Sequence, residues 1–269
     1  MPRINAVPFY ENRTLEGICR TIVDAGFDSL ELCRPHVIER LVTPELRKTF
    51  SDWASGLSLS FLGVDVWVDV QPYEAPERTL DDFRAVVDFA ADLDLGHIIT
   101  TEGQIDVVGG RTKSECLTVL VPLFQQVADV AASREITVLI EPHPDTLSID
   151  NAFTIELIDG VDRANIGLVY DCAHYAVGQP ETYVASIEQL GERIRHLHFS
   201  DGDARTYSLH LPLGEGTLDL DGMIAALKDV GFNGTLTNDI WGYPMLEDGA
   251  RRNAARITAL EQILGLAQP

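Results

Sequence analysis

The sequence predicts an α/β protein that forms a single (β/α)8 TIM barrel. Strand-like and helix-like segments alternate along the chain and make eight pairs, a pattern typical of a parallel sheet covered by helices. No linker or change of composition divides the 269 residues, of which 45% are hydrophobic, and this length suits one closed barrel. The alternative is an open doubly wound sheet, but no G-x-G-x-x-G follows an early strand. We therefore expect one domain over residues 1–269.

The first half of the chain supplies four strands and three clear helices. Apolar residues from Leu15 to Ala25 recur at helical spacing before Gly26, which predicts a helix over 14–26. Thr43-Pro44 opens the next helix, because proline suits the first helical position. The predicted strands lie near 5–9 and at 27–33, 57–66 and 96–101, and the predicted helices at 14–26, about 43–55, and 78–93.

The second half repeats the pattern more clearly. The segment from Leu117 to Ala131 has the strongest helical periodicity, and I-T-V-L-I-E at 136–141 is the most hydrophobic strand. The predicted strands lie at 136–141, 166–171, 194–199 and 235–240, and the predicted helices at 113–133, 150–159, 181–190, 219–230 and 247–264.

The charge of the chain excludes several kinds of partner. The formal net charge is −22, from 42 acidic and 20 basic residues, and no basic stripe is present. Nucleic acids and anionic membranes are therefore not expected partners, and we interpret the acidity as a solvated surface. The first residues lack the apolar region of a signal peptide, and no apolar run reaches the roughly 18 residues of a membrane helix. We expect a cytoplasmic protein.

The last four strands each end in a polar residue. Glu141 ends the fifth strand, Asp171 the sixth, and Asn238-Asp239 the eighth, while the seventh contains His196-x-His198. The active site of a (β/α)8 barrel lies at the carboxyl ends of its strands. The two histidines share one face of their strand, and the later one is closer to the end. We therefore expect Glu141, Asp171, His198 and Asp239 to converge.

Three carboxylates and one imidazole would make a mainly oxygen site. Such a site suits Mn²⁺, Mg²⁺ or Co²⁺ better than a structural zinc. Taken singly, each carboxylate has an alternative interpretation as a helix N-cap or a loop residue. The choice between a metal ligand and a loop residue matters most for Asp239, which follows an apolar strand in G-T-L-T-N-D-I-W. Burying an unpaired carboxylate costs several kcal/mol. Either it faces water or it has a partner such as a metal.

Several motifs resemble one known family over essentially the whole chain. They are F-D-S-L-E-L at 27–32, I-E-P-H at 140–143, Y-D-C-A-H at 170–174, H-L-H-F-S-D at 196–201, H-L-P-L-G-E-G at 210–216 and G-F-N-G-T-L-T-N-D at 231–239. With these the chain resembles the xylose isomerase-like TIM-barrel superfamily, also called the sugar phosphate isomerase/epimerase family. The motifs are specific for the fold and weak for the substrate.

The resemblance implies a divalent metal, commonly Mn²⁺, held by Glu141, Asp171, His198 and Asp239. The family usually has Glu at the last of these positions, and Asp is shorter by one methylene, about 1.5 Å. The metal would then shift, or a water would bridge, or the fourth ligand would be weaker. In the epimerases of the family the first and last carboxylates also move protons, which makes Glu141 and Asp239 candidate catalytic residues.

Further residues are expected to contact the substrate. By resemblance these are His174, Arg205 and His210. Beside the Glu141 position, His143 is a candidate general base with an imidazole poised near pH 7, although a hydrogen-bonded loop histidine is an equal alternative. Trp67, with neighbouring aromatic residues, is expected either to form an apolar wall for a sugar or to belong to the core.

The expected function is a metal-dependent isomerase or epimerase acting on a keto-sugar or related polyol. A proton next to the carbonyl would be removed and returned through a metal-bound enediolate. The three lysines lie in predicted helices away from the strand ends, so Schiff-base chemistry is not expected.

The alternative is a lyase on the same scaffold that shares this first step. It would be a dehydratase, or a C-glycoside deglycosidase subunit that eliminates an aglycone from a 3-keto sugar with a small second subunit. Otherwise a homo-oligomer is expected. An endonuclease IV-type nuclease is disfavoured by the charge of −22, and a non-catalytic binding barrel is the remaining possibility.

Overall fold

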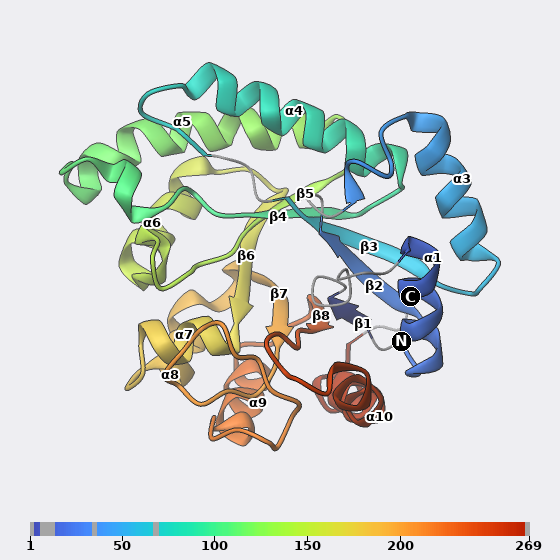
Figure 1. Cartoon of the computed structure of the whole chain (residues 1–269). Helices are drawn as coiled ribbons and strands as arrows, with labels where there is room; N and C mark the ends of the chain where they lie inside the picture. The colour runs from blue at the N-terminus through green and yellow to red at the C-terminus, as the bar shows by residue number, and fades with distance from the viewer. Residues whose placement is uncertain (1–2, 6–13, 34–36, 67–69, 267–269) are drawn as a thin grey trace.

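Eight parallel strands close into a barrel in the order of the sequence (Figure 1). The computed structural model describes residues 3–5, 14–33, 37–66 and 70–266. Each strand pairs with its neighbours in the chain, and the barrel closes where Ile4 of the first strand pairs with Asn238 of the last. The predicted (β/α)8 barrel is confirmed.

The elements alternate as the sequence predicts. The strands are β1 (Arg3–Asn5), β2 (Ser29–Cys33), β3 (Ser60–Asp65), β4 (His97–Thr100), β5 (Thr137–Ile140), β6 (Ile166–Asp171), β7 (Ile194–Phe199) and β8 (Thr235–Asn238). The longer helices are α1 (Leu15–Asp24), α3 (Pro44–Ser55), α4 (Pro76–Asp92), α5 (Lys113–Ala132), α6 (Asn151–Val161), α8 (Tyr183–Leu190), α9 (Leu220–Asp229) and α10 (Leu246–Leu264). Shorter helices are α7 (Cys172–Gly178) and the 3-10 turns η2 (Ile105–Val108), η3 (Leu147–Ile149) and η4 (Gly191–Arg193).

Local capping explains where the helices begin. Thr14 accepts a hydrogen bond from the backbone of Gly17 at the start of α1, and Thr112 forms a capping box with Glu115 at the start of α5. These side chains satisfy backbone N–H groups that have no partner inside the helix.

Near the candidate site one predicted boundary was wrong and one helix was not predicted. Strand β8 ends at Asn238, so Asp239 lies just beyond the strand rather than inside it. The additional helix α7 begins directly after β6, because the Asp171 side chain caps it by accepting from the His174 backbone N–H at 2.7 Å. Both differences place polar side chains at the mouth of the barrel.

The interior of the barrel is separate from the larger core under the helices. Ile99, Leu139 and Val169, on three adjacent strands, form a small cluster of their own, whereas the alternate residues of these strands belong to the large core between sheet and helices. Alternation along each strand accounts for this division. All four cysteines are free and buried.

Helix α5 is long and apolar. By length and composition it could cross a membrane, although no such segment was predicted. In the barrel it packs between α4 and α6 in the outer layer (Figure 1). The side chains that it buries are Cys116, Leu120, Leu123, Phe124, Val127, Ala128 and Ala131. This burial is typical of a core helix.

Candidate metal centre and active site

Glu141, Asp171 and His198 come together at the mouth of the barrel. Nδ1 of His198 lies 2.6 Å from Oε1 of Glu141 and 3.8 Å from Oδ2 of Asp171. All three side chains are buried, and one ligand atom of each lies within 4.8 Å of the others. The structure therefore brings together three of the four predicted ligands, and their role as ligands stays a prediction.

Asp239 reaches this group through His210. Its Oδ2 lies 2.7 Å from Nδ1 of His210, which in turn lies 3.8 Å from Oδ2 of Asp171. Asp171, His174 and His210 form a second compact set of possible ligands. The imidazole of His210 therefore lies between the carboxylates of Asp239 and Asp171.

The ends of β7 and β8 hold His210 in place. Its backbone exchanges two hydrogen bonds with Trp241, at 2.9 and 3.1 Å. The loop that contains His210 is held together by Asp201, whose carboxylate accepts from the backbone N–H groups of Gly202, Gly214 and Leu218. A Cβ on Gly216 would lie 2.2 Å from this carboxylate, which accounts for the glycine there.

Ionisation differs among the clustered groups. Burial opposes the charge on Glu141, but the adjacent His198 holds the pKa of Glu141 well below its usual value. Burial raises the pKa of Asp171. Burial also opposes the charge on His210, but the carboxylates of Asp171 and Asp239 raise its pKa to about 9. Burial lowers the pKa of His174 well below the usual value, so His174 is a neutral imidazole able to act as an acceptor or a ligand.

Unpartnered polar atoms mark the same place. Oδ2 of Asp171, Nδ1 of His174 and Nδ1 of His210 are buried without a hydrogen bond among the described residues; the close approach of His210 to Asp239 lacks hydrogen-bond geometry. Buried polar atoms in native proteins nearly always have a partner. A divalent cation would provide one, and this mixed set of oxygen and nitrogen donors fits such an ion.

His143 lies beside Glu141 at the edge of the cluster. Its Nε2 is 3.5 Å from Oε2 of Glu141, and its ring centre is 3.8 Å from that of His174. Burial opposes protonation of His143, but the hydrogen bond and charge of Glu141 raise its pKa above the usual value. The backbone N–H of His143 donates to Thr146, which fixes the loop after β5.

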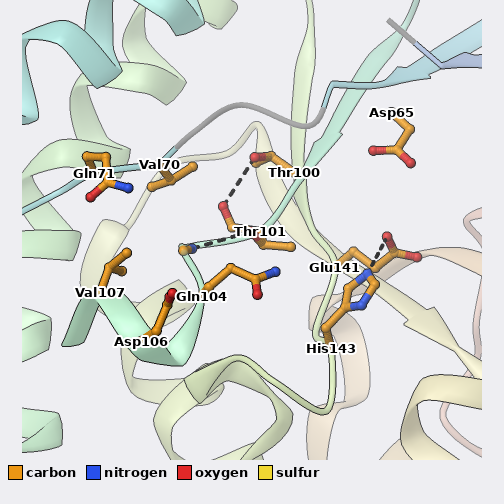
Figure 2. A pocket seen from close by; sticks show the side chains of 11 residues that line it. Asp65, Val70, Gln71, Thr100, Thr101, Gln104, Asp106, Val107, Glu141 and His143 are labelled. Atoms are coloured by element: carbon orange, nitrogen blue, oxygen red, sulfur yellow. Dashed lines mark hydrogen bonds and ion pairs between the residues drawn. The ribbon is translucent and has the colours of Figure 1, made fainter. Parts of the chain in front are cut away.

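Two cavities open at this mouth. One has a volume of about 230 Å³ and lies over the cluster. Its walls include Asp65, Glu141, His143, His174, His198, Tyr207, Ser208, His210, Asp239 and Trp241. The other, of about 480 Å³, adjoins it and shares Asp65, Glu141 and His143 (Figure 2).

The residues predicted to contact the substrate differ in whether they line the two cavities. His174 and His210 line the smaller cavity, as does Trp241. Arg205 is exposed and is absent from the walls of both cavities, whereas Tyr207 and Ser208 of the same loop face the smaller one. Trp67 lies outside the described residues.

A second buried cluster was missed by the sequence analysis. Glu31 on β2 is fully buried, and His97, His196 and His198 surround its carboxylate with Nε2 atoms 2.7, 3.1 and 3.1 Å away. Burial opposes the charge on Glu31, but His196 and its neighbours hold the pKa of Glu31 well below its usual value. This cluster lies inside the barrel, beneath His198.

Gly63 explains how His97 reaches Glu31 across an intervening strand. In the sheet Glu31 is level with Gly63 of β3, and Gly63 is level with His97 of β4. A Cβ on Gly63 would lie 2.0 Å from the His97 ring. The missing side chain leaves room for the ring to cross, a relation that only the strand register reveals.

The fold agrees with comparison to known proteins. A family described as xylose isomerase-like TIM barrel matches residues 19–260. The chain belongs to this family.

Its sequence relatives are distant. An inosose isomerase of Halalkalibacterium halodurans is 25% identical over 178 residues, 61% of this chain and 60% of the relative. A fructoselysine 3-epimerase of Shigella flexneri is 20% identical over 254 residues, 86% of this chain and 87% of the relative. A 3-dehydroshikimate dehydratase of Bacillus anthracis is 28% identical over 123 residues, 39% of this chain and 43% of the relative. All three relatives are named as enzymes. The chain spans 60% of the length of the inosose isomerase and 43% of that of the dehydratase.

Among solved structures, the IOLI protein with a binding zinc atom superposes with a TM-score of 0.77. The sequences are 19% identical, and the match covers 98% of this chain and 97% of the other. The likeness shows a shared fold.

Proposed function

We propose that this chain is a divalent-metal-dependent isomerase or epimerase that acts on a keto-sugar or related polyol. The observation that carries the proposal is the convergence of Glu141, Asp171 and His198, with Asp239 beside His210. This cluster has buried ligand atoms without hydrogen bonds among the described residues, and all of it except Asp171 lines one cavity. Glu141, Asp171, His198 and Asp239 would hold the metal. Once bound, a divalent ion would polarise a carbonyl and stabilise negative charge on its oxygen.

Glu141 is the proposed base. Its low pKa keeps the carboxylate ionised, so it can accept the proton from the carbon next to the carbonyl. His143, at 3.5 Å from Glu141, would relay that proton. Asp239 with His210 would return a proton from the β8 side of the site, and His174 and His210 would bind substrate hydroxyls.

A deuterium-exchange assay tests the proposal. Purified protein with Mn²⁺ in D₂O should incorporate deuterium next to the carbonyl of at least one member of a panel of keto-sugars. Glu141→Gln should abolish exchange. Unchanged exchange and metal binding in that variant would remove Glu141 from the site. Metal analysis of the protein as purified would decide among Mn²⁺, Mg²⁺, Co²⁺ and Zn²⁺.

A lyase is the second candidate, and the position of His143 favours it. Glu141 and His143 lie together on one side, and both border the larger cavity. After Glu141 takes the proton, the electron pair of the C–H bond would form a double bond as a leaving group departs from the next carbon. His143 would protonate that group. Release of water or an aglycone, instead of an isomer of the same composition, would favour the lyase.

Location and assembly are also matters of proposal. We propose a cytoplasmic homo-oligomer; for a C-glycoside lyase, a small second subunit would take part. Mass measurement of the assembly in solution would test the oligomer.

A further inference from the structure

The larger cavity continues the candidate active site away from the metal cluster. Its volume is about 480 Å³, twice that of the cavity over the cluster. The two share Asp65, Glu141 and His143, so both border the proposed base. Binding pockets for substantial ligands measure about 300–1,000 Å³. The smaller cavity alone falls below this range, while the two together lie within it.

The walls of the larger cavity combine apolar and hydrogen-bonding groups. Figure 2 shows Val70 and Val107 on the side away from Glu141 and His143. The hydrogen-bonding groups are those of Gln71, Thr100, Thr101 and Gln104. An apolar surface with amide and hydroxyl groups around it matches a sugar-like ring, which has an apolar face and a polar edge.

Charge restricts what this cavity can accept. Asp65 and Asp106 contribute carboxylates, and among the described residues that line it there is no lysine or arginine. With a net charge of −22 on the chain, a phosphate or carboxylate in this cavity would be repelled and would have no cationic partner.

The wall is anchored to the barrel. Buried Glu102 accepts hydrogen bonds from the backbone N–H and the hydroxyl of Ser148, at 2.8 and 2.6 Å. Gln104 forms a β-bridge with Thr146, and Ile105 donates to the Asp145 carbonyl. These contacts tie the loop after β4 to the loop after β5, so the cavity is shaped before a ligand arrives.

We propose that the larger cavity binds a second, uncharged hydroxylated ring of the substrate. The protein then acts on a glycoside or similar sugar conjugate, with the reacting keto-sugar over the metal cluster and the attached ring between Val107 and Gln104. This inference rests on the proposed function, because it assigns the keto-sugar to the smaller cavity.

Three probes test it: fructose, a hexosyl-fructose disaccharide that retains the ketone, and fructose 6-phosphate. Their dissociation constants are measured by saturation-transfer NMR with the Mg²⁺-loaded protein, and deuterium exchange is followed on the same samples. We expect the disaccharide to bind at least tenfold more tightly than fructose, and the phosphate ester to bind most weakly.

Two variants separate the cavities. Val107→Trp fills the larger cavity and should remove the advantage of the disaccharide while leaving fructose binding unchanged. Gln104→Ala, at an exposed position, should reduce disaccharide affinity threefold to tenfold without lowering the stability of the protein. Val42→Trp, at an exposed valine elsewhere, is the matched control and should change neither affinity.

The outcomes distinguish this inference from the proposed function. Equal binding of fructose and disaccharide, unaffected by either variant, would overturn the second-ring site even if deuterium exchange occurs. Tighter binding of the disaccharide that Val107→Trp abolishes, without exchange in any probe, would uphold the second-ring site and reject the isomerase. Binding of none of the probes would overturn both.

Discussion

Two buried clusters of carboxylates and imidazoles lie one above the other in this barrel, and they differ in whether they border a cavity at its mouth. The core cluster comprises Glu31, His97 and His196. The oxygens of Glu31 lie 2.7 Å from Nε2 of His97 and 3.1 Å from Nε2 of His198, while Nε2 of His196, 3.1 Å from Glu31, lacks hydrogen-bond geometry. The core cluster is absent from the walls of the two cavities at the mouth.

The mouth cluster comprises Glu141, Asp171, His198, His210 and Asp239. It contains buried atoms without hydrogen bonds among the described residues, and it borders a cavity. Similar residue types therefore lie in different settings: a buried network closed off from both cavities stabilises the fold, whereas one that borders a cavity can be reached by a ligand.

The largest expected effect breaks the core cluster. Glu31→Ala leaves His97 and His196 without their carboxylate and His198 with Glu141 alone. Losing one partner of a buried pair costs about 3–5 kcal/mol. The free energy of unfolding, measured by urea denaturation of metal-free protein, should fall by that amount. Glu141→Gln, the control in the mouth cluster, should cost much less. Equal unfolding midpoints for the two variants would contradict the division between the clusters.

Removal of the metal should have the next largest effect and should act on the mouth cluster. Binding to the native state alone stabilises a protein by about 2.7 kcal/mol when free ligand is 100 times the dissociation constant. Chelation should therefore lower the thermal midpoint, and added Mn²⁺ or Zn²⁺ should restore it. Asp171→Asn should abolish this response. A thermal midpoint that changes with neither chelator nor added metal would argue against an ion site.

Asp239→Asn should have a moderate effect. The amide keeps the size of the side chain but loses the negative charge, so we expect Mn²⁺ affinity in a calorimetric titration to fall by about 10-fold, or ~1.4 kcal/mol. Asp239→Glu should retain affinity, since it restores the residue usual in the family. Unchanged affinity in Asp239→Asn would exclude Asp239 from the metal site.

The smallest expected effect on stability and metal affinity is that of His143→Gln. The side chain lies at the rim and is about one-quarter exposed, so unfolding and Mn²⁺ binding should change by less than ~0.5 kcal/mol. Deuterium exchange should nevertheless slow by about 10²-fold or more, as for loss of a proton-transfer group. Deuterium exchange at the wild-type rate would exclude His143 from proton transfer and would support its interpretation as a hydrogen-bonded loop residue.

The sequence predicts the parts of the mouth that depend on short-range pattern. Glu141, Asp171 and His198 follow from period-two alternation and from the common edge at which parallel strands end. The pairing of Asp239 with His210 does not follow, because it depends on how the loop gathered by Asp201 returns to β8.

The core cluster could not be predicted from the sequence, for a different reason. Glu31 and His97 lie 66 positions apart in the chain, and their contact depends on the absence of a side chain at Gly63 between them. Only the register of β2, β3 and β4 brings these three positions level. Periodicity within a single strand carries no information about such alignment.

His198 belongs to both clusters, with Nδ1 directed to Glu141 and Nε2 to Glu31. Its ring is therefore oriented from below by the folded barrel itself. Such preorganisation means that little rotamer entropy remains to be lost when an ion arrives. For the proposed metal centre, changing the metal preference would then require substitutions in the barrel interior as well as at its mouth.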